Sequence, residues 1–260
     1  MEFTQTIKSS LRALTLLCLG LQQSGIAQQQ AMISANPPFP SPETLSYRVE
    51  WRMVTAGAAK LKLARVQQDW QINLNIESAG LVSRLYRIAD SYTVTSNDKF
   101  CGVNSSFEAQ EGKRHVLESE QFDNGRRKAI FDVNDVVKNV KEHHEIDIVP
   151  CTHEVIGALE SLRQQKIDVG KSITIPIANG KKMAYAKIEA QAKENVTIDG
   201  KSYSSVRYEA YIFDNVVFRR KGSLQIWLTD DAAHVPIKMR FQMGFPIGNI
   251  TLELEKAERS

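Results

Sequence analysis

The sequence has little excess charge, few cysteines and only one long apolar run. Its 33 lysines and arginines are nearly balanced by 30 aspartates and glutamates, which leaves a net charge of +3. Nucleic-acid-binding domains carry a concentrated basic excess, so this balance argues against that class of function. The sequence also lacks a Walker-type glycine loop, a dinucleotide fingerprint and a Gly-x-Ser-x-Gly motif, which carry nucleotide binding and serine hydrolysis. We therefore expect neither a cofactor nor a nucleic-acid partner.

The one long apolar run lies near the start of the chain, at residues 13–21, and follows a lysine and an arginine. The small residues of Gly25-Ile26-Ala27 come next, and this order is that of a secretory signal peptide. The run is nine residues long, whereas a membrane-spanning helix needs about 20. We expect residues 1–27 to be a signal peptide cleaved after Ala27. The mature protein would then lie in the periplasm, with the extracellular space as the alternative.

Three cysteines are present, and Cys18 falls inside the predicted signal peptide. Cys101 and Cys151 remain, and an even pair in an oxidising compartment favours a bridge. Neither belongs to a Cys-x-x-Cys pair, so the usual signature of a redox or zinc site is missing. We expect a structural disulfide between Cys101 and Cys151. Closing a loop of that length stabilises a protein by about 4 kcal/mol in the chain-entropy model.

The rest of the chain is dominated by alternation of apolar and polar residues. Residues 28–43 are polar and proline-rich and predict a disordered leader, and residues 44–258 predict a single β-rich domain. The period of two is typical of strands with one buried face. Asn-Gly and Asp-Gly pairs between the runs are typical of tight hairpins. The positions expected to be largely buried are Tyr47, Val49, Trp51, Ile72, Leu74, Ile237, Met239 and Phe241.

One segment of ordinary length has helical spacing. We expect a helix within residues 152–166, with Thr152 as its N-cap and with Ile156, Leu159 and Leu162 buried on the sheet. Residues 81–88 predict one or two further helical turns. The predicted fold class is mainly β, with about a dozen antiparallel strands and one packed helix. An antiparallel barrel, an incomplete barrel around the helix and a sandwich all remain open, because each covers or removes sheet edges.

Three segments resemble the bacterial domain of unknown function 3108 family. They are YRVEWRMVTAGAAKLKL at 47–63, HEVIGALESLRQQKIDVGKSITIPI at 153–177 and IWLTDDAAHVPIKM at 226–239. Glu154 departs from the family, which favours Asp just inside the helix, but it keeps the negative charge there. The resemblance implies an exported envelope protein rich in β structure, with no catalytic residues to carry over. At the level of fold alone, the general plan of this family is similar to that of periplasmic lipoprotein carriers, whose incomplete barrel wraps an apolar cavity.

Candidate chemical groups are few. Asp230 and Asp231 are adjacent carboxylates suited to a hard cation or to acid–base work, but they lie where a turn is expected. His143 and His144 have no third ligand at a typical spacing, so we expect no metal. We predict no catalytic residue and no enzymatic activity. A hydrolase that uses Asp230 or Asp231 remains the alternative.

Aromatic residues and basic clusters complete the set of candidates. Trp51 and Trp70 lie in alternating runs and predict core packing. Trp227 is out of phase with its apolar neighbours, which points it toward a second packed layer, the helix or a ligand. Three basic clusters, at 126–128, 181–182 and 219–221, are typical of solvated hairpins, or of contacts with anionic lipid headgroups or glycans if they gather on one rim.

Two functions remain for this export signal and this β pattern. The first is non-enzymatic binding of an apolar or amphipathic ligand, such as a lipid, in a concave β-sheet. The second is a structural or adaptor role in which the protein binds an envelope polysaccharide or an outer-membrane partner.

Overall fold

A computed structural model of the chain describes residues 41–178, 180–211, 222–243 and 248–259. The chain divides into two compact units, Met1–Met32 and Ile33–Ser260, and all of the described residues belong to the second. The predicted signal peptide and the predicted leader up to residue 40 lie outside the described residues. The end of that leader is ordered, because the first strand begins at Glu43 and not at residue 44 or 45.

Fourteen strands and two helices make up the described part of the chain. The strands are β1 Glu43–Trp51, β2 Val54–Val66, β3 Asp69–Ser78, β4 Ala89–Ser96, β5 Gly102–Glu111, β6 Arg114–Asp123, β7 Lys128–Asp135, β8 Val140–Asp147, β9 Ser172–Ala178, β10 Met183–Ile198, β11 Lys201–Tyr211, β12 Gly222–Thr229, β13 Pro236–Met243 and β14 Gly248–Arg259. The helices are α1 Gly80–Leu85 and α2 Val155–Arg163. Neither of these two helices is long and apolar enough to cross a membrane.

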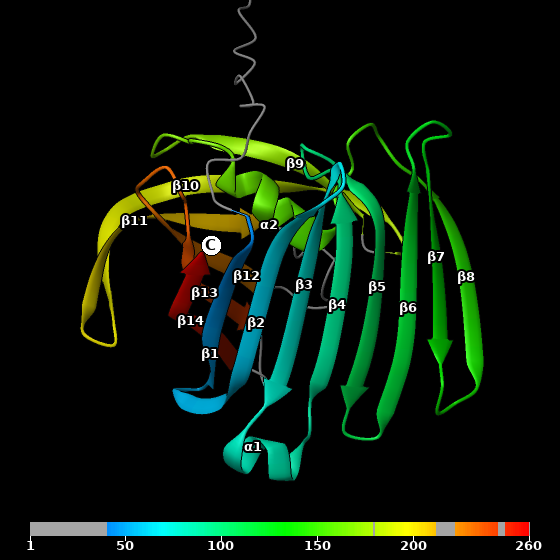
Figure 1. The fold of residues 1–260 in the computed structure, drawn as a ribbon, viewed down its shortest axis with the longest axis horizontal. Coiled ribbons are helices and arrows are strands. Elements are labelled where there is room, and N and C mark those ends of the chain that lie inside the picture. The colour runs from blue at the N-terminus through cyan, green and yellow to red at the C-terminus, as the bar shows by residue number, and fades with distance from the viewer. Residues whose placement is uncertain (1–40, 179, 212–221, 244–247, 260) are drawn as a thin grey trace, which may run out of the picture. The chain divides into compact units, whose positions relative to one another are not determined.

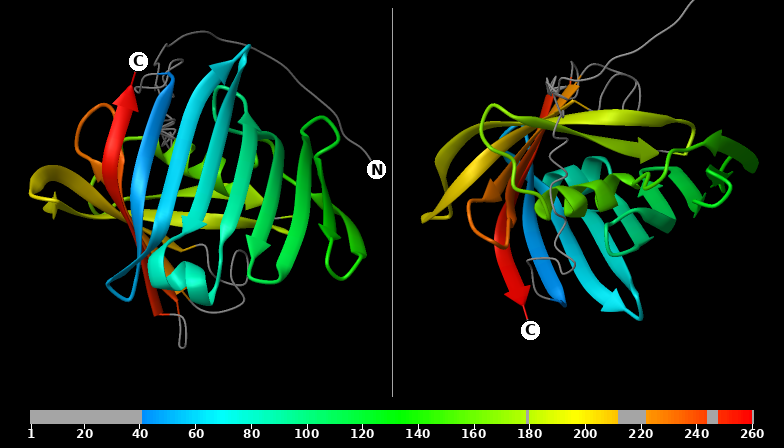
Figure 2. Two further views of the ribbon diagram at one scale, coloured as in Figure 1. Left: turned by 60° about the horizontal axis from the view of Figure 1, so that its bottom comes forward. Right: turned by 90° about the horizontal axis from the view of Figure 1, so that it is seen from above.

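All fourteen strands belong to one antiparallel sheet, in the order β8-β7-β6-β5-β4-β3-β2-β1-β14-β13-β12-β11-β10-β9. The chain starts in the middle at β1 and runs outward, strand by strand, to the edge strand β8. The connection that contains α2 then carries it to the other edge, β9, and the chain returns inward to β14 beside β1. The sheet curves around α2, which lies on its concave side (Figure 1, Figure 2).

The sheet does not close, because β8 and β9 each have only one strand neighbour. Of the three predicted architectures, this is the incomplete barrel around a helix, and the closed barrel and the sandwich were wrong. The mainly β class and the single packed helix of ordinary length are confirmed. The short α1 also lies near residues 81–88, where helical turns were predicted.

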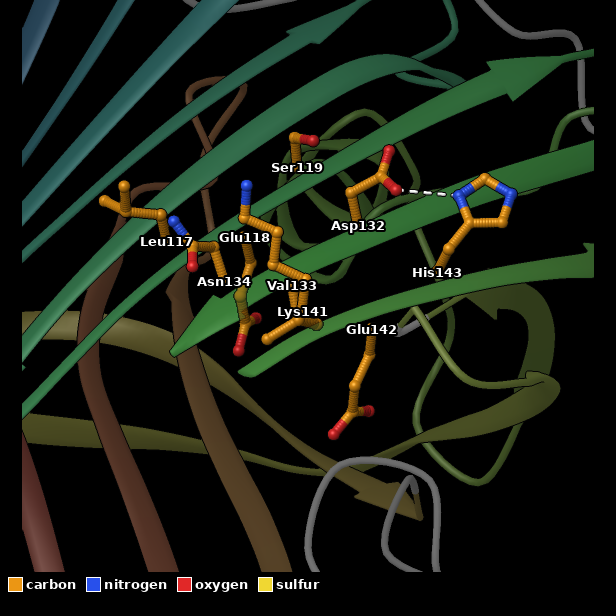
Figure 3. A pocket seen from close by; sticks show the side chains of 9 residues that line it. All are labelled: Leu117, Glu118, Ser119, Asp132, Val133, Asn134, Lys141, Glu142 and His143. Atoms are coloured by element: carbon orange, nitrogen blue, oxygen red, sulfur yellow. Dashed lines mark hydrogen bonds and ion pairs between the residues drawn. The ribbon is translucent and has the colours of Figure 1, made fainter. Parts of the chain in front are cut away.

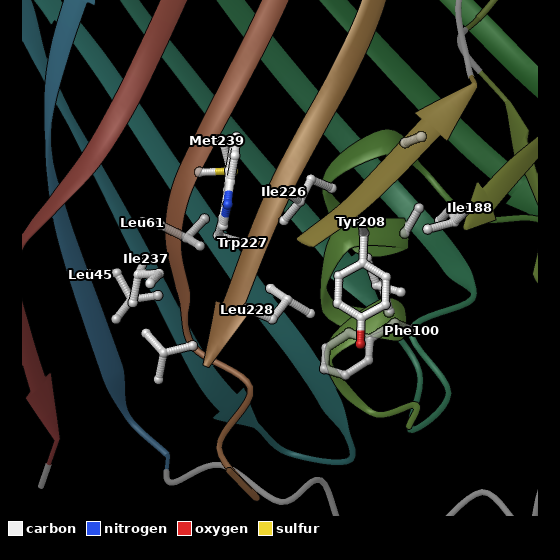
Figure 4. Packing of buried hydrophobic residues seen from close by; sticks show 14 of the residues in the cluster. Leu45, Leu61, Phe100, Ile188, Tyr208, Ile226, Trp227, Leu228, Ile237 and Met239 are labelled. Atoms are coloured by element: carbon white, nitrogen blue, oxygen red, sulfur yellow. The ribbon is translucent and has the colours of Figure 1, made fainter. Parts of the chain in front are cut away.

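The main core lies between the concave face of the sheet and α2. Ala158 and Leu162 of the helix are buried among strand residues such as Leu63, Ile72 and Val94. Figure 4 shows how side chains from strands distant in sequence meet in this layer. The helix passes close to the sheet at Gly157, where an added Cβ would lie 3.1 Å from the carbonyl oxygen of Phe100. A side chain at this position would push the helix away from β4.

The helix begins later than predicted, and a different residue caps it. Glu154, not Thr152, is the N-cap, and its carboxylate accepts hydrogen bonds from the amides of Ile156 at 2.6 Å and Gly157 at 3.3 Å. The Thr152 hydroxyl instead donates to the carbonyl of Val149 at 2.8 Å. Glutamate has one more methylene than the usual cap residues, and the buried turn before the helix gives it room to fold back.

Several residues are less buried than the alternation predicted. Tyr47, Ile72, Ile237 and Met239 are buried as expected. Val49, Leu74 and Phe241, together with Ile156 and Leu159 of the helix, are only half-buried. The reason is that α2 covers only part of the concave face, and no other element among the described residues forms a second layer over the rest.

Trp51 departs furthest from its prediction. Its side chain is 39% exposed, whereas Trp70 is buried as expected. Trp51 is the last residue of β1 and is followed by Arg52 and Met53, whose φ angles of 50° and 68° form the tight turn into β2. The Arg52 guanidinium lies 5.2 Å from the indole centroid, so the ring packs against a cation at the surface instead of the core.

A buried guanidinium fixes α2 to the sheet. Arg163, at the end of α2, contacts Glu43 of β1 at 2.6 Å and Glu160 of its own helix at 2.8 Å. Its Nε also donates to the carbonyl of His234 in the β12–β13 connection at 3.1 Å. All three charged side chains are at most 1% exposed, so each charge depends on the others for solvation.

We predict that Arg163→Met strongly destabilises the protein. The substitution leaves the buried carboxylate of Glu160 without its cation and leaves Glu43 with only Arg259, whose Nε lies 3.0 Å from its other oxygen. Breaking a buried ion pair in this way costs roughly 3–5 kcal/mol. Chemical denaturation measures this loss of unfolding free energy. Arg114→Met is the matched control, because Arg114 pairs with Glu111 at the surface, and such pairs contribute roughly 0–1 kcal/mol. Equal effects of the two substitutions would contradict the role given to Arg163.

Candidate functional site

Half-buried apolar side chains form a continuous strip across the concave face, on the half of the sheet that α2 leaves uncovered. The strip, called the apolar strip below, consists of Leu224, Phe241, Leu252, Val49, Ile76, Leu74, Tyr92 and Phe107. These residues come from β12, β13, β14, β1, β3, β4 and β5. Strand pairing places some of them directly opposite each other and the others on diagonal positions of the same face, where Phe241 pairs with Ile250 and Leu252 with Met239.

The first half of the strip crosses the centre of the sheet. Leu224 of β12 pairs with Phe241 of β13, and Leu252 of β14 pairs with Val49 of β1. All four pack at the margin of the main core without being fully covered. Leucine, phenylalanine and valine have no polar atoms beyond the backbone, so this half of the strip offers only apolar contact.

The second half of the strip continues toward β5. Between the two halves, strand β2 contributes Ala59, which pairs with Ile76, and the buried Leu61, which pairs with Leu74. Leu74 then pairs with Tyr92, and Tyr92 pairs with Phe107. The rings of Tyr92 and Phe107 stack with centroids 3.8 Å apart. Burial and the carboxylates of neighbouring acids raise the pKa of Tyr92, so its hydroxyl is neutral and available as a donor.

The helix presents a second apolar surface. Val155, Ile156 and Leu159 are half-buried and pack against the margin of the core, whereas Ala158 and Leu162 are fully buried. Residues four apart lie on the same side of a helix, so Val155 and Leu159 extend one side of α2. The helix therefore has a fully covered side and a partly uncovered apolar side.

Carboxylates lie at the β5–β6 end of the apolar strip. Glu118 pairs with Phe107, and Glu120 lies two residues further along β6 with its side chain buried. Burial is the main cause that raises the pKa of Glu120 to about 7, with a further contribution from the nearby Glu154 carboxylate. Burial likewise raises the pKa of Glu154 to about 7 against the opposing effect of the amides that it caps. Near neutral pH these two groups are therefore partly protonated.

A glycine turn covers this polar end. The amide of Gly180, between β9 and β10, donates to Glu120 at 3.2 Å. Its φ is +78°, and an added Cβ would lie 2.5 Å from the Phe131 ring. Only glycine accommodates both the left-handed backbone and this close approach. The concave face thus combines an apolar strip with a buried acidic end, an amphipathic lining.

The two candidate aspartates do not form a paired acidic site. The Asp231 carboxylate accepts hydrogen bonds from the Thr229 hydroxyl at 2.8 Å and the Ala233 amide at 3.0 Å. Asp230 instead contacts Lys193 at 2.7 Å. Both lie in the connection between β12 and β13, so the predicted turn is where the structure places them. Within the described ranges, no group of three or more His, Cys, Asp or Glu residues is arranged to hold a metal ion.

Of the two predicted histidines, His143 lies at a shallow depression of about 360 Å³ on β6, β7 and β8 (Figure 3). His143 contacts Asp132 at 2.7 Å, and Asp132 pairs with Ser119 on the next strand. The aspartate therefore lies between the serine and the histidine. A nucleophilic serine must instead bond the histidine, and these two are two strands apart, or roughly 10 Å. This arrangement does not activate the serine.

One further histidine, His153, and the predicted candidate Trp227 are bonded within the fold. His153 is buried, and its Nδ1 donates to the carbonyl of Phe100 at 2.7 Å, while burial lowers its pKa. Trp227 does point away from the apolar face of β12, but charged side chains cover it. Its indole N–H donates to Glu194, and the ammonium of Lys238 lies 5.8 Å from the ring centroid. Trp227 therefore packs under a charged surface layer.

Cys101 and Cys151 stand at disulfide distance, with their Cα atoms 4.6 Å apart. Bridged cysteines have Cα separations of about 4.4–6.8 Å. Cys101 immediately precedes β5, and Cys151 lies in the connection that leads into α2. The neighbouring amide of Gly102 donates to the carbonyl of Thr152 at 2.9 Å, so a bond between the two cysteines would hold the start of the helix against β5.

Sequence reasoning missed the apolar strip as a site, because its residues were predicted to be ordinary core. Of the predicted basic clusters, residues 126–127 lie in the turn between β6 and β7, and Lys181 contacts Glu142 at 2.6 Å. The cluster at 219–221 lies outside the described residues. The signal that could have found the strip is an excess of strands over helix, since one short helix cannot cover a sheet of this width.

The arrangement of strands and helix is similar to that of solved proteins. One is a beta-barrel-like protein of domain of unknown function DUF1849 from Brucella abortus, with a TM-score of 0.56 and 9% sequence identity, which covers 85% of this chain and 98% of that chain. Another is a protein with a YmcC-like fold from Bacteroides fragilis, with a TM-score of 0.37 and 6% identity, which covers 86% of this chain and 99% of that chain. At these identities the first likeness shows the fold alone, and the second carries no argument.

The sequence itself gives a more specific match. A family model described as protein of unknown function (DUF3108) matches residues 46–255. Among curated proteins, none has a sequence that matches this chain significantly.

We predict that raising the pH from 5 to 8 lowers the unfolding free energy through Glu120 and Glu154. The pKa of each is higher in the folded state, at about 7, than the ordinary value near 4.3. The folded state therefore binds the proton more tightly than the unfolded state. The stabilisation that this proton gives the folded state is lost as pH rises through 7. Glu120→Gln should reduce this loss by roughly 3 kcal/mol in chemical denaturation at the two pH values. The prediction would be contradicted if Glu120→Gln and the exposed control Glu77→Gln lost the same unfolding free energy between pH 5 and pH 8.

We predict that Cys101 and Cys151 are bonded. Unfolded, unreduced full-length chain should then titrate with one thiol, that of Cys18, and with three after reduction. The double replacement Cys101→Ser/Cys151→Ser should lower the unfolding free energy by roughly 2–5 kcal/mol. Three thiols before reduction would refute the bond.

Proposed function

The chain belongs to the family described as protein of unknown function (DUF3108), and we propose that it binds an apolar or amphipathic ligand along the apolar strip. The observation that carries this proposal is the continuity of half-buried apolar residues across the concave face. Contiguous apolar surface that the fold leaves uncovered marks binding sites on soluble domains. The covered half of the same face shows that the chain buries such residues where it has a second layer.

The geometry favours an elongated ligand. The strip runs from β12 to β5 across eight neighbouring strands, and neighbouring strands lie about 4.8 Å apart. A ligand along it would lie between the sheet and the partly uncovered side of α2. The acidic end at Glu118 and Glu120 supplies polar groups for a headgroup that donates hydrogen bonds. An acyl chain with a polar head has this combination of length and polarity.

The proposal includes export and excludes catalysis. The signal peptide expected at residues 1–27 would place the protein in the periplasm, where an apolar molecule needs a protein surface to shield it from water. In the described part of the chain, the candidate serine, histidine and aspartate groups are arranged as structural contacts. A carrier or sensor of an apolar molecule fits these observations better than a hydrolase.

An adaptor role is the second candidate, and the sheet edges bear on it. Strand β8 is an open edge, but its sequence VKEHHEID is charged and exposed, which discourages addition of another strand. Strand β9 is partly covered, because the His153 amide donates to the carbonyl of Pro176 at 2.9 Å. Neither edge strand therefore supports an adaptor role in which a partner protein adds a strand to the sheet.

We predict saturable binding of the neutral fluorescent probe N-phenyl-1-naphthylamine. Phe241→Ser and Leu74→Ser should each raise its Kd about tenfold, because each removes the contact of one large apolar side chain. Leu117→Ser is the control, since Leu117 is an exposed leucine of β6 on the convex face, away from the strip. Fluorescence titration measures the Kd, and thermal melts verify that all variants fold. Identical Kd values for the strip variants and the control would refute binding at the strip.

A further inference from the structure

Exposed apolar side chains gather at one end of strands β1–β8. Within the described ranges, fourteen large apolar side chains are exposed. Nine of them lie at the β1–β2 turn, the β3–β4 connection and the β7–β8 turn, at the lower end in Figure 1. These nine, called the apolar end below, are Trp51, Met53, Val54, Leu81, Leu85, Tyr86, Val136, Val137 and Val140. Of the other five, only Val66 lies beside a turn at the opposite end of these strands.

The degree of exposure separates this end from ordinary surface. Met53 is 93% exposed, Leu85 77% and Leu81 66%. Isolated exposed apolar residues are normal on protein surfaces, but a cluster at one end marks an interaction site. The apolar end also differs from the apolar strip, whose residues are half-buried on the concave face.

Helix α1 contributes nothing to the core that would explain its leucines. None of its residues is buried, and Leu81 and Leu85 are four apart, so they lie on one side of the helix. The helix is nevertheless fixed in place. The amide of Ala79 donates to the carbonyl of Ala56 in β2 at 2.8 Å. The sheet therefore holds these leucines outward in a defined position.

The connections between strands at this end carry only positive charge. The four connections at residues 52–53, 79–88, 112–113 and 136–139 contain five lysines and arginines and no carboxylate. These five are Arg52, Arg84, Arg87, Lys113 and Lys138. Glu111 and Asp135, at adjacent strand ends, are already paired with Arg114 and Lys138. Arg84, Arg87 and Lys113 make no ion pair with any residue in the described part of the chain.

We propose that the apolar end docks on the surface of a bilayer that contains anionic phospholipid. Exposed leucine, methionine and valine side chains enter the boundary between headgroups and acyl chains, and tryptophan and tyrosine favour that same interface. The unpaired arginines and lysine attract the anionic headgroups. A protein partner would bury the same side chains, but it would need carboxylates to match cations spread over several turns. A membrane supplies mobile anions to each turn.

The proposal stands independently of ligand binding on the concave face. The apolar end lies at the turns, whereas the apolar strip lies on the concave face of the sheet, on the half that α2 does not cover. A protein that docks with this end on a membrane would hold the uncovered half of its concave face close to the lipid. The probe titration and the membrane assay use different variants, so each can fail alone.

The test is co-sedimentation of the full chain with vesicles of phosphatidylglycerol or of phosphatidylcholine. Every variant retains residues 1–40, so differences report on the folded domain. The double variant Leu81→Ser/Leu85→Ser should reduce the partition coefficient on phosphatidylglycerol vesicles at least about tenfold. Arg84→Gln/Arg87→Gln should reduce it by about fivefold for each arginine on phosphatidylglycerol vesicles and leave binding to phosphatidylcholine vesicles unchanged.

The controls make the outcome decisive. Val66→Ser/Leu117→Ser removes two exposed apolar residues elsewhere and should leave partitioning unchanged. Brominated acyl chains should quench the fluorescence of Trp51, and Trp51→Phe should abolish that quenching, because Trp70 and Trp227 are buried. Equal partitioning of the leucine variant and the wild type would overturn the proposal. So would a dimer in sedimentation equilibrium that Leu81→Ser/Leu85→Ser dissociates, since the apolar end would then meet a second copy.

Discussion

The buried guanidinium of Arg163 is the contact on which the arrangement of helix and sheet depends. It joins β1 through Glu43, its own helix through Glu160, and the β12–β13 connection through the carbonyl of His234. These groups come from distant parts of the chain and meet only when the sheet has formed its central β1–β14 pairing. Buried ion pairs add little net stability, but they penalise other arrangements strongly. We interpret this cluster as the device that selects the position of α2.

The position of α2 decides which half of the concave face is core and which half is surface. Leu162 and Ala158 complete a buried layer with β1–β4, while Leu159, Ile156 and the apolar strip remain half-buried. The segment before the other end of the helix is held near β5 by the hydrogen bonds from the Gly102 amide to the carbonyl of Thr152 and from His153 to the carbonyl of Phe100. A helix fixed at both ends cannot slide along the sheet to cover the strip. The strip is therefore a stable feature of the fold and available to a ligand.

Two apolar surfaces with different character follow from this arrangement. The apolar strip lies on the half of the concave face that α2 does not cover and ends at partly protonated carboxylates, which suits a single amphipathic molecule. The apolar end is more exposed than the strip, and its cations Arg84, Arg87 and Lys113 pair with no acid in the described part of the chain. This combination suits an extended anionic surface. A fold shared with other proteins of unknown function does not specify either role. Ligand binding and membrane docking are both inferred from the apolar and charged side chains that this chain places at uncovered positions.

Local residue patterns were enough to predict the alternation of strands, the location of the one substantial helix, the cysteine pair and the turn at Asp230 and Asp231. These features depend on periodicity and turn chemistry, which neighbouring residues decide. Long-range packing determined that the sheet stays open, that Glu154 and not Thr152 caps α2, and that Trp51 is at the surface. It also determined that Leu74 and Phe241 border a half-covered face. Alternation says which face of a strand is apolar, but whether a second layer covers that face depends on the placement of one short helix by contacts from distant strands.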